Sequence, residues 1–207
     1  MPTAVDSAGP AAQGPNLDDV WRSAAKYMRV RKNDIHLPLS FDFAEQLLTE
    51  CTGANGLVVR LAILLHDIGW YCVDEEDILT RGFGENWQTA DIRYVHEREG
   101  CRLAREILGG LGYTEEIITR VTAIIEGHDT RPYARSHEDE LVRDADKLWR
   151  FTTAGIAIAS GWFHKTPSQY VDDVLSMTFR QLHTDVARRI ATRELKQSRR
   201  LLRIGVL

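Results

Sequence analysis

The stretch LVVRLAILLHDIG, residues 57–69, decides the fold of this chain. Its side chains are apolar on nearly every side of a helix, and only Arg60 interrupts them before His66 and Asp67. A helix that is hydrophobic all round lies at the centre of a fold, because no face of it suits water. We therefore expect a central helix whose last turn carries a histidine and an aspartate into the interior.

The segments on either side of this helix are also predicted to be helical. Apolar residues recur at helical spacing, and no stretch shows the period of two that marks a half-buried strand. The other expected helices cover about 16–31, 35–51, 91–108, 114–127, a segment from 136 that continues or breaks near 155 and 161, and 167–204. Residues 73–89, which hold acids, glycines and Trp87, are predicted to form a long irregular loop or lid.

These patterns predict an all-α fold, a single-domain helical bundle over 16–207. Residues 1–15 are rich in Ala, Pro and Gly, bury too little to offset the entropy of ordering, and are expected to form a disordered leader. Thr166, Pro167 and Gln169 have the spacing of a capping box, which predicts a long C-terminal helix over 167–204.

Composition excludes several classes of protein. The 207 residues carry a net charge of −4, which argues against a protein that coats nucleic acid or an anionic membrane. The longest apolar run, 61–65, is far shorter than the roughly 20 residues that a membrane span needs. The three cysteines form no Cys-x-x-Cys pair, so we expect neither disulfides nor a zinc ribbon, and a reducing cytoplasm fits best.

Histidines stand on the apolar stripes of four different helices. His36, His96 and His128 lie three, four, seven or eleven residues from apolar side chains of their own helices, and His66 closes the central helix beside Asp67. Burying four imidazoles without strong partners would cost several kcal/mol in total, on the order of 1–3 for each. A divalent metal offsets that cost, since neutral imidazole and carboxylate are its usual ligands.

A further carboxylate ligand is available in the segment VRDADKLW, residues 142–149. Asp144 and Asp146 both fall roughly 90–110° from the centre of the apolar stripe of this helix, on opposite flanks. Periodicity alone does not choose between them.

The order of these residues resembles the HD superfamily, whose pattern is H…HD…D. His36, then His66-Asp67 in LLHDIG, then Asp146 in DADKL, match it over about 35–150. The resemblance, and not geometry, implies that Asp146 is the last ligand of the metal. It further implies that His96 and His128 hold a second ion or grip the substrate.

Most members of that superfamily are α-helical, bind divalent metals and hydrolyse phosphate esters. The resemblance therefore implies a metal-dependent phosphohydrolase acting on a small phosphorylated metabolite, a nucleotide or a sugar phosphate. It would use one or two ions (Mn, Fe, Co, Ni or Mg) to activate a water, and Asp67 would bridge a pair. Asp67 and Lys147 are the candidate catalytic residues, and Arg131 and Arg98 are candidates for binding the phosphate.

Two alternatives stay open at this stage. A smaller HD branch, including myo-inositol oxygenase and a phosphonate dioxygenase, holds two irons with the same six ligands, so an oxygenase acting on a small polyol or phosphonate is the first. The second is a metal-binding regulatory domain without turnover, since eight basic residues against two acids between Arg180 and Arg203 could dock a partner. The simpler explanation is that these basic residues form a solvent-exposed helix face that packs against the acidic remainder of the same chain.

Some features serve more than one interpretation. Trp70, Tyr71 and Trp87 could line a pocket for a base or sugar ring, or be ordinary core aromatics. The expected partner is a small molecule, and neither nucleic acid nor a membrane is expected. A homodimer through the last helix is a further hypothesis.

Overall fold

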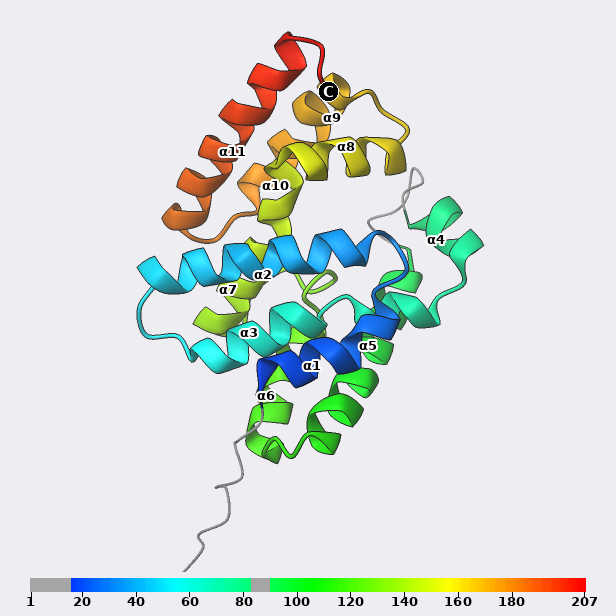
Figure 1. Ribbon diagram of the computed structural model, residues 1–207, viewed down its shortest axis with the longest axis vertical. Helices are drawn as coiled ribbons and strands as arrows, with labels where there is room; N and C mark the ends of the chain where they lie inside the picture. Colours follow the sequence, from blue (N-terminus) through cyan, green and yellow to red (C-terminus); the bar gives the residue numbers. More distant parts are fainter. Residues whose placement is uncertain (1–15, 83–89) are drawn as a thin grey trace, which may run out of the picture.

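The computed structural model describes residues 16–82 and 90–207, and within these ranges every regular element is helical, with no strand (Figure 1). This confirms the all-α class. The α-helices are α1 (Leu17–Ala24), α2 (Asn33–Glu50), α3 (Gly56–Leu65), α4 (Glu75–Arg81), α5 (Ile92–Gly110), α6 (Glu115–Ile125), α7 (His137–Leu148), α8 (Thr153–Trp162), α9 (Pro167–Tyr170), α10 (Ser176–Arg180) and α11 (Asp185–Arg203). Short 3-10 turns lie at η1 (Ala25–Tyr27), η2 (Ile68–Cys72) and η4 (Trp149–Phe151), and a π-helical turn lies at η5 (Val171–Leu175).

The apolar helix α3 lies at the centre, as the sequence predicts. It begins at Asn55, whose side chain accepts hydrogen bonds from the backbone N–H groups of Leu57 and Val58. From Val58 onward every residue of α3 except Arg60 is buried, and α2, α6 and α7 pack around the helix. Arg60 reaches the surface and pairs with Glu45 of α2.

The turn η2, directly after α3, packs on α5, and α5 in turn packs on α6. Consequently the C-terminal end of α3 lies against the N-terminal half of α5. The helices α8 to α11 form a second layer beyond α7 and η4 (Figure 1). The end of α3 is thus enclosed by elements from distant parts of the chain.

The prediction of a single helix over 167–204 is wrong. The capping box at Thr166 is present and starts a helical run that ends at Arg180. The chain then turns, and Thr184 caps the separate helix α11 by accepting a hydrogen bond from the N–H of Ala187. The break has a physical cause, because Leu182 is buried and the side chain of Asp144 binds the backbone that follows it.

The prediction of an irregular loop over 73–89 is also wrong in part, because Glu75–Arg81 form the helix α4. Asp74 caps α4, with its carboxylate accepting from the N–H groups of Glu76 and Asp77. Acids in the first turn and Arg81 in the last turn complement the helix dipole, which is a helix signal in its own right. Residues 83–89, with Trp87, and the leader over 1–15 lie outside the described residues.

The basic helix α11 is bound to the body of the molecule by its own charges. Arg189 pairs with Glu50, and Arg193 donates a hydrogen bond to Gln46, both on α2. These contacts favour the account in which this helix face covers an acidic neighbour.

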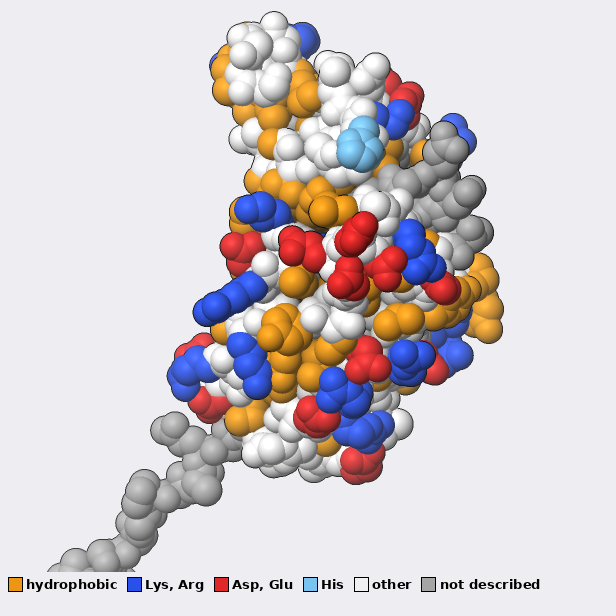
Figure 2. Space-filling model, turned by 90° about the vertical axis from the view of Figure 1, so that its right-hand side faces the viewer, with side chains coloured by type: hydrophobic (Ala, Val, Ile, Leu, Met, Phe, Trp, Pro, Cys, Tyr) orange, Lys and Arg blue, Asp and Glu red, His pale blue; other side chains and the backbone are white. Residues whose placement is uncertain are grey.

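The surface on the side of α4 shows no field of a single sign. On that face, acidic side chains gather near the middle, and basic and hydrophobic ones lie around them (Figure 2). Among the described residues, no single helix combines the length and hydropathy of a membrane span. One bent pair, Gly56–Cys72 with Glu75–Arg81, passes on length and composition alone, with a bend of 105°.

Candidate metal centre

The fold brings all six predicted metal ligands into one buried cluster. They come from five different parts of the chain, and each is at most 6% exposed. The six are His36 on α2, His66 and Asp67 at the end of α3, His96 on α5, His128 after α6, and Asp146 on α7.

Asp67 lies at the middle of the cluster and divides its two carboxylate oxygens between two sets of histidines. Oδ2 lies 3.4 Å from Nδ1 of His36 and 3.9 Å from Nε2 of His66. Oδ1 lies 3.5 Å from Nε2 of His96 and 3.5 Å from Nε2 of His128. Both oxygens of the Asp67 carboxylate therefore face histidine nitrogens.

Asp146 completes the first of these two sets. Its Oδ1 lies 3.1 Å from Nε2 of His36 and 3.3 Å from Nε2 of His66. The ligand atoms of His36, His66 and Asp146 all lie within 4.8 Å of one another, and so do those of His66, Asp67 and His128. His66 belongs to both groups, so they overlap, and each is compact enough to surround one ion.

The orientation of the imidazoles fits a cation and does not fit an empty hydrogen-bond network. The Nδ1 atoms of His66 and His128 donate to the carbonyl oxygens of Ile63 and Ile125, at 2.7 and 2.8 Å. In a neutral ring, Nε2 therefore carries a lone pair, and it faces carboxylate oxygens that carry lone pairs as well. His66 Nε2 has no hydrogen-bond partner in the described part of the chain. A divalent ion satisfies both sides at once, so the donor set fits a metal.

Aromatic rings hold two of the histidines in place. The ring of His36 stacks on Trp149 at 4.6 Å, and that of His96 stacks on Trp70 at 4.0 Å. Trp70 also donates its indole N–H to Asp67 Oδ1 at 3.0 Å. It is therefore a core residue that positions two ligands, whereas Tyr71 is half exposed and lies outside the centre.

Without metal, His96, Asp67 and Asp146 have the ionisation of ligands, whereas His128 carries a proton that a metal must displace. Burial lowers the pKa of His96 to about 3, which leaves this ring neutral. Burial opposes protonation of His128, but the hydrogen bond with Asp67 and the charge of Glu97 raise its pKa to about 9. Burial also works against the ionised forms of Asp67 and Asp146, yet neighbouring histidines hold both pKa values well below the usual range. Both carboxylates are therefore anionic ligands at neutral pH.

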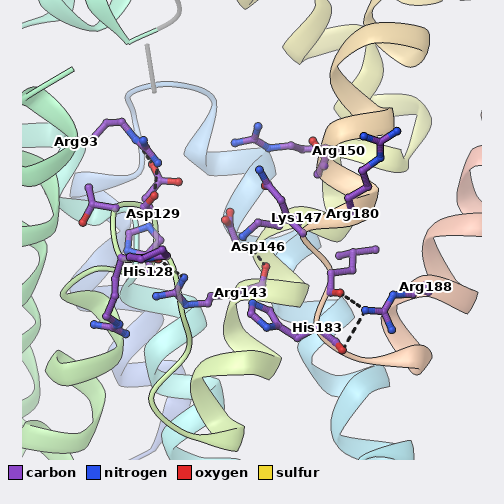
Figure 3. Close-up of a pocket in the computed structure, with 16 residues that line it drawn as sticks. Arg93, His128, Asp129, Arg143, Asp146, Lys147, Arg150, Arg180, His183 and Arg188 are labelled. Carbon is purple, nitrogen blue, oxygen red and sulfur yellow. Dashed lines mark hydrogen bonds and ion pairs between the residues drawn. The ribbon is translucent and has the colours of Figure 1, made fainter. Parts of the chain in front are cut away.

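A cavity of about 650 Å³ opens beside the cluster, and His128 and Asp146 belong to its lining. Figure 3 shows Arg93, Asp129 and His128 on one wall and the chain from Arg180 to Arg188 on the other, with Asp146, Lys147 and Arg150 between them. The cavity is rich in basic side chains, namely Arg93, Arg131, Arg143, Lys147, Arg150, Arg180 and Arg188.

Lys147, a predicted catalytic residue, and Arg131, a predicted phosphate-binding residue, lie in different environments. Lys147 lines the cavity next to Asp146, and its Nζ has one long contact, 3.4 Å, to the carbonyl oxygen of Arg143. Arg131 also lines it, but its guanidinium binds the carboxylate of Asp139 and the carbonyl oxygen of Tyr133. Arg131 therefore holds the loop in which it lies, and the structure does not offer its guanidinium to a substrate.

The structure places Arg98, a predicted substrate-binding residue, outside the cavity. Its side chain is 70% exposed and lies beside Glu99, 3.5 Å from a carboxylate oxygen. Arg98 follows His96 by two positions, which is roughly 200° around a helix. Because His96 points into the cluster, Arg98 points away from it.

Two residues near the start of α2, Arg31 and Asn33, contact Asp67 and were not predicted from the sequence to belong to the site. Arg31 places its Nη1 3.3 Å from Asp67 Oδ2 and its guanidinium 4.1 Å from the Trp70 ring centre. Asn33 donates from its side chain to the backbone oxygen of Asp67 at 3.0 Å. Arg31 and Lys32 both have positive φ, 50° and 55°, a strained turn of the kind that gathers at functional sites. Arg31 and Lys32 lie in the turn before α2 and Asn33 is its first residue, so no helical periodicity covers them together.

Glu97 was also missed, although it adjoins His96. Its carboxylate accepts from the backbone N–H groups of Asp129 and Thr130, both at 2.9 Å, and from the Thr130 hydroxyl at 2.7 Å. This carboxylate therefore holds the chain that follows His128.

The two aspartates that periodicity left open have separate tasks. Asp146 faces the histidines, as the resemblance implies. Asp144 is fully buried on the other flank, where its carboxylate accepts from the N–H groups of His183 and Thr184 at 2.7 and 2.9 Å and from the Thr184 hydroxyl at 2.7 Å. Asp144 thus anchors the turn between α10 and α11.

We expect matched Asp→Asn variants to separate these tasks. Asp146→Asn should lose bound metal while melting close to the wild-type protein measured without metal. Asp144→Asn should keep its metal but have a lower melting temperature. Weakening its charge-assisted hydrogen bonds costs about 2–3 kcal/mol, which in a chain of this size lowers the melting temperature by about 5–10 °C. Elemental analysis and thermal melts measure both effects, and the reverse pattern would assign the ligand to Asp144.

A family model described as HD domain matches residues 37–150, which include five of the six clustered residues and begin directly after His36. Comparison with curated proteins and with solved structures found no match.

Proposed function

Since the chain belongs to the HD domain family, we propose that it is a metal-dependent phosphohydrolase acting on a small phosphorylated metabolite, a nucleotide or a sugar phosphate. The observation that carries this proposal is the position of the cluster. Two of its ligands, His128 and Asp146, border a cavity of about 650 Å³ that seven lysine and arginine residues also line. A cavity of that charge favours an anionic substrate over a neutral polyol.

The six residues would hold metal in two adjoining sets. His36, His66 and Asp146, with Oδ2 of Asp67, would surround one ion. His96 and His128, with Oδ1 of Asp67, would surround a second. Bound divalent metal polarises a phosphoryl oxygen and lowers the pKa of the attacking water.

The residues around the cluster orient the ligands and the substrate. Trp70 and Asn33 fix the side chain and the backbone of Asp67, so that its oxygens keep their division between the two sets. Lys147 extends into the cavity from the position next to Asp146, where its ammonium group would bind a phosphoryl oxygen. In the reaction, water attacks phosphorus, the bond to the ester oxygen breaks, and that oxygen leaves with a proton.

Metal content and phosphate release test the proposal together. Protein purified without a histidine tag or added metal should contain about one or two divalent ions per chain by elemental analysis. It should release phosphate from a panel of nucleotides and sugar phosphates, lose that activity when a chelator removes the metal, and regain it with Mn²⁺, Co²⁺ or Ni²⁺.

Either of two results would contradict the proposal and favour another function. Two irons per chain, with oxygen consumption when a phosphonate or a small polyol is added, would place the chain in the oxygenase branch. Stable metal binding with no turnover of either kind would favour a regulatory domain.

A further inference from the structure

The basic side chains of the cavity differ in whether an acid neutralises them. Four are paired: Arg93 with Asp129, Arg131 and Arg143 with Asp139, and Arg188 with Asp185. For Lys147, Arg150 and Arg180, no carboxylate lies within ion-pair distance in residues 16–82 and 90–207. Lys147 and Arg150 are half-buried and Arg180 is exposed, and ammonium and guanidinium groups with no carboxylate partner can each pair with an anion from outside the chain.

Lys147 and Arg150 extend from the end of α7 and from η4. Figure 3 shows their side chains reaching into the space between the two walls, above Asp146. The Nε atom of Arg150 is buried and has no hydrogen-bond partner in the described part of the chain. The hydroxyl of Tyr170 lies beside Arg150, and the carboxylates of Asp146 and Asp129 act on both cations at longer range.

Arg180 lies on the opposite wall, at the end of α10. Its side chain is exposed, and the part of the chain that the structure describes provides it with no hydrogen bond or ion pair. The turn that follows it is held by Asp144, so Arg180 stands on an anchored backbone rather than on a loose loop. It lies outside the stretch that matches the family model, which ends at residue 150.

The positive charge of Lys147, Arg150 and Arg180 together exceeds what one phosphoryl group would neutralise. Lys147, beside the ligand Asp146, is enough to accompany a phosphoryl group at the metal cluster. Arg150 and Arg180 are then left over, and a cavity of about 650 Å³ has ample room beyond a single phosphate.

Resting on the proposed function, we propose that the substrate carries two phosphoryl groups, as in a nucleoside diphosphate or a sugar bisphosphate. One group lies at the metal cluster with Lys147, and Arg150 and Arg180 bind the other. These two arginines are therefore specificity-determining residues.

Binding of hydrolysis-resistant phosphonates tests this assignment without turnover. Calorimetric titration of the metal-loaded full chain, in about 0.15 M salt, compares methylenediphosphonate with methylphosphonate. The wild-type protein should bind methylenediphosphonate at least about tenfold more tightly. Arg180→Gln and Arg150→Gln should each reduce that preference by about tenfold, the effect of one charge-assisted hydrogen bond, and leave methylphosphonate binding within about threefold.

Arg98→Gln is the matched control, because it removes the same charge from an exposed site outside the cavity. It should behave as wild type. Arg180 is exposed, so its variant should fold even if Arg150→Gln does not, and melting curves check both. If the preference for methylenediphosphonate survives in Arg180→Gln, or if that variant weakens both ligands equally, the assignment is wrong.

The outcomes also separate this inference from the proposed function. A preference that depends on Arg180, in a protein that releases no phosphate from any ester, would uphold the two-phosphoryl site and reject the hydrolase. Hydrolysis of monoesters as fast as of diphosphates, unaffected by Arg180→Gln, would uphold the hydrolase and reject the two-phosphoryl site.

Discussion

Asp67→Ala is expected to lose its metal and its activity together. The carboxylate is the one ligand whose oxygens face both sets of histidines, so its removal disrupts every ion that the cluster could hold. Changing a residue that only orients a ligand already costs about 10–100-fold in metal affinity, so loss of a ligand should cost more. Phosphate release should fall below detection, and elemental analysis should find less than about a tenth of the wild-type metal.

The same substitution removes other partners of Asp67. The indole N–H of Trp70 and the guanidinium of Arg31 both contact the carboxylate in the buried cluster. Asp67→Ala could therefore weaken the fold as well, and Asp67→Asn is the variant that separates the two effects. It keeps the shape and an oxygen for Trp70 but removes the charge, so it should fold while still binding metal poorly.

A matched control shows whether the effect belongs to this position. Asp42 lies exposed on α2, so Asp42→Asn removes one carboxylate without touching the cluster and should keep wild-type metal content. If Asp67→Asn also kept its metal, the assignment of the centre would be wrong.

The parts of this site that sequence analysis could predict are those carried by regular helices. His36 and His96 lie inward because they share faces with apolar residues, and burial confirms their positions. Arg98 lies on the opposite face of α5 from His96, so the same periodicity predicts that it points outward. Helical periodicity thus predicts direction, but only when each candidate residue is tested against it.

Periodicity could not separate Asp144 from Asp146, and the reason is physical. A helix with one solvated flank leaves a polar residue on that flank in water, but both flanks of α7 are covered. One side faces the histidines and the other faces the turn at Thr184. Both aspartates are therefore buried, and only tertiary contacts assign their tasks.

The break after α10 and the positions of Arg31 and Arg180 are also set by tertiary contacts. The turn before α11 depends on a carboxylate some forty residues earlier in the sequence. Arg31 reaches Asp67 through a backbone with positive φ, a conformation that no residue type in this segment signals. Long-range anchors of this kind leave no local pattern.

A packing constraint that the sequence does not reveal leads to the prediction with the largest effect on stability. Gly69 lies in η2, where the backbone passes close to α5. A Cβ atom at this position would lie 1.9 Å from the backbone oxygen of His96 and 2.4 Å from the backbone nitrogen of Gly100. Both neighbours belong to the backbone of a long helix, so neither can rotate away as a side chain would.

Gly69→Ala should therefore push η2 away from α5 and separate Asp67 from His96. Overpacking in a core costs about 1–3 kcal/mol and more where the clash is with backbone, so we expect melting to fall by about 10 °C or more. The soluble fraction should also hold less metal, since the two ligand sets are joined through Asp67.

Two other glycines provide the controls for this prediction. At Gly109, near the end of α5, an added Cβ meets nothing within 4 Å, so Gly109→Ala should raise stability by about 0.5–1 kcal/mol. At Gly100, the nearest contacts are 3.3 Å to the side chain of Ile125 and 3.4 Å to the backbone oxygen of His66, so Gly100→Ala should be intermediate. Thermal melts of the three alanine variants should thus rank in the order of these contacts. If Gly69→Ala melted like the wild-type protein and kept its full metal content, the prediction would be wrong. The close approach of η2 to α5 would then not be required to hold Asp67 near His96.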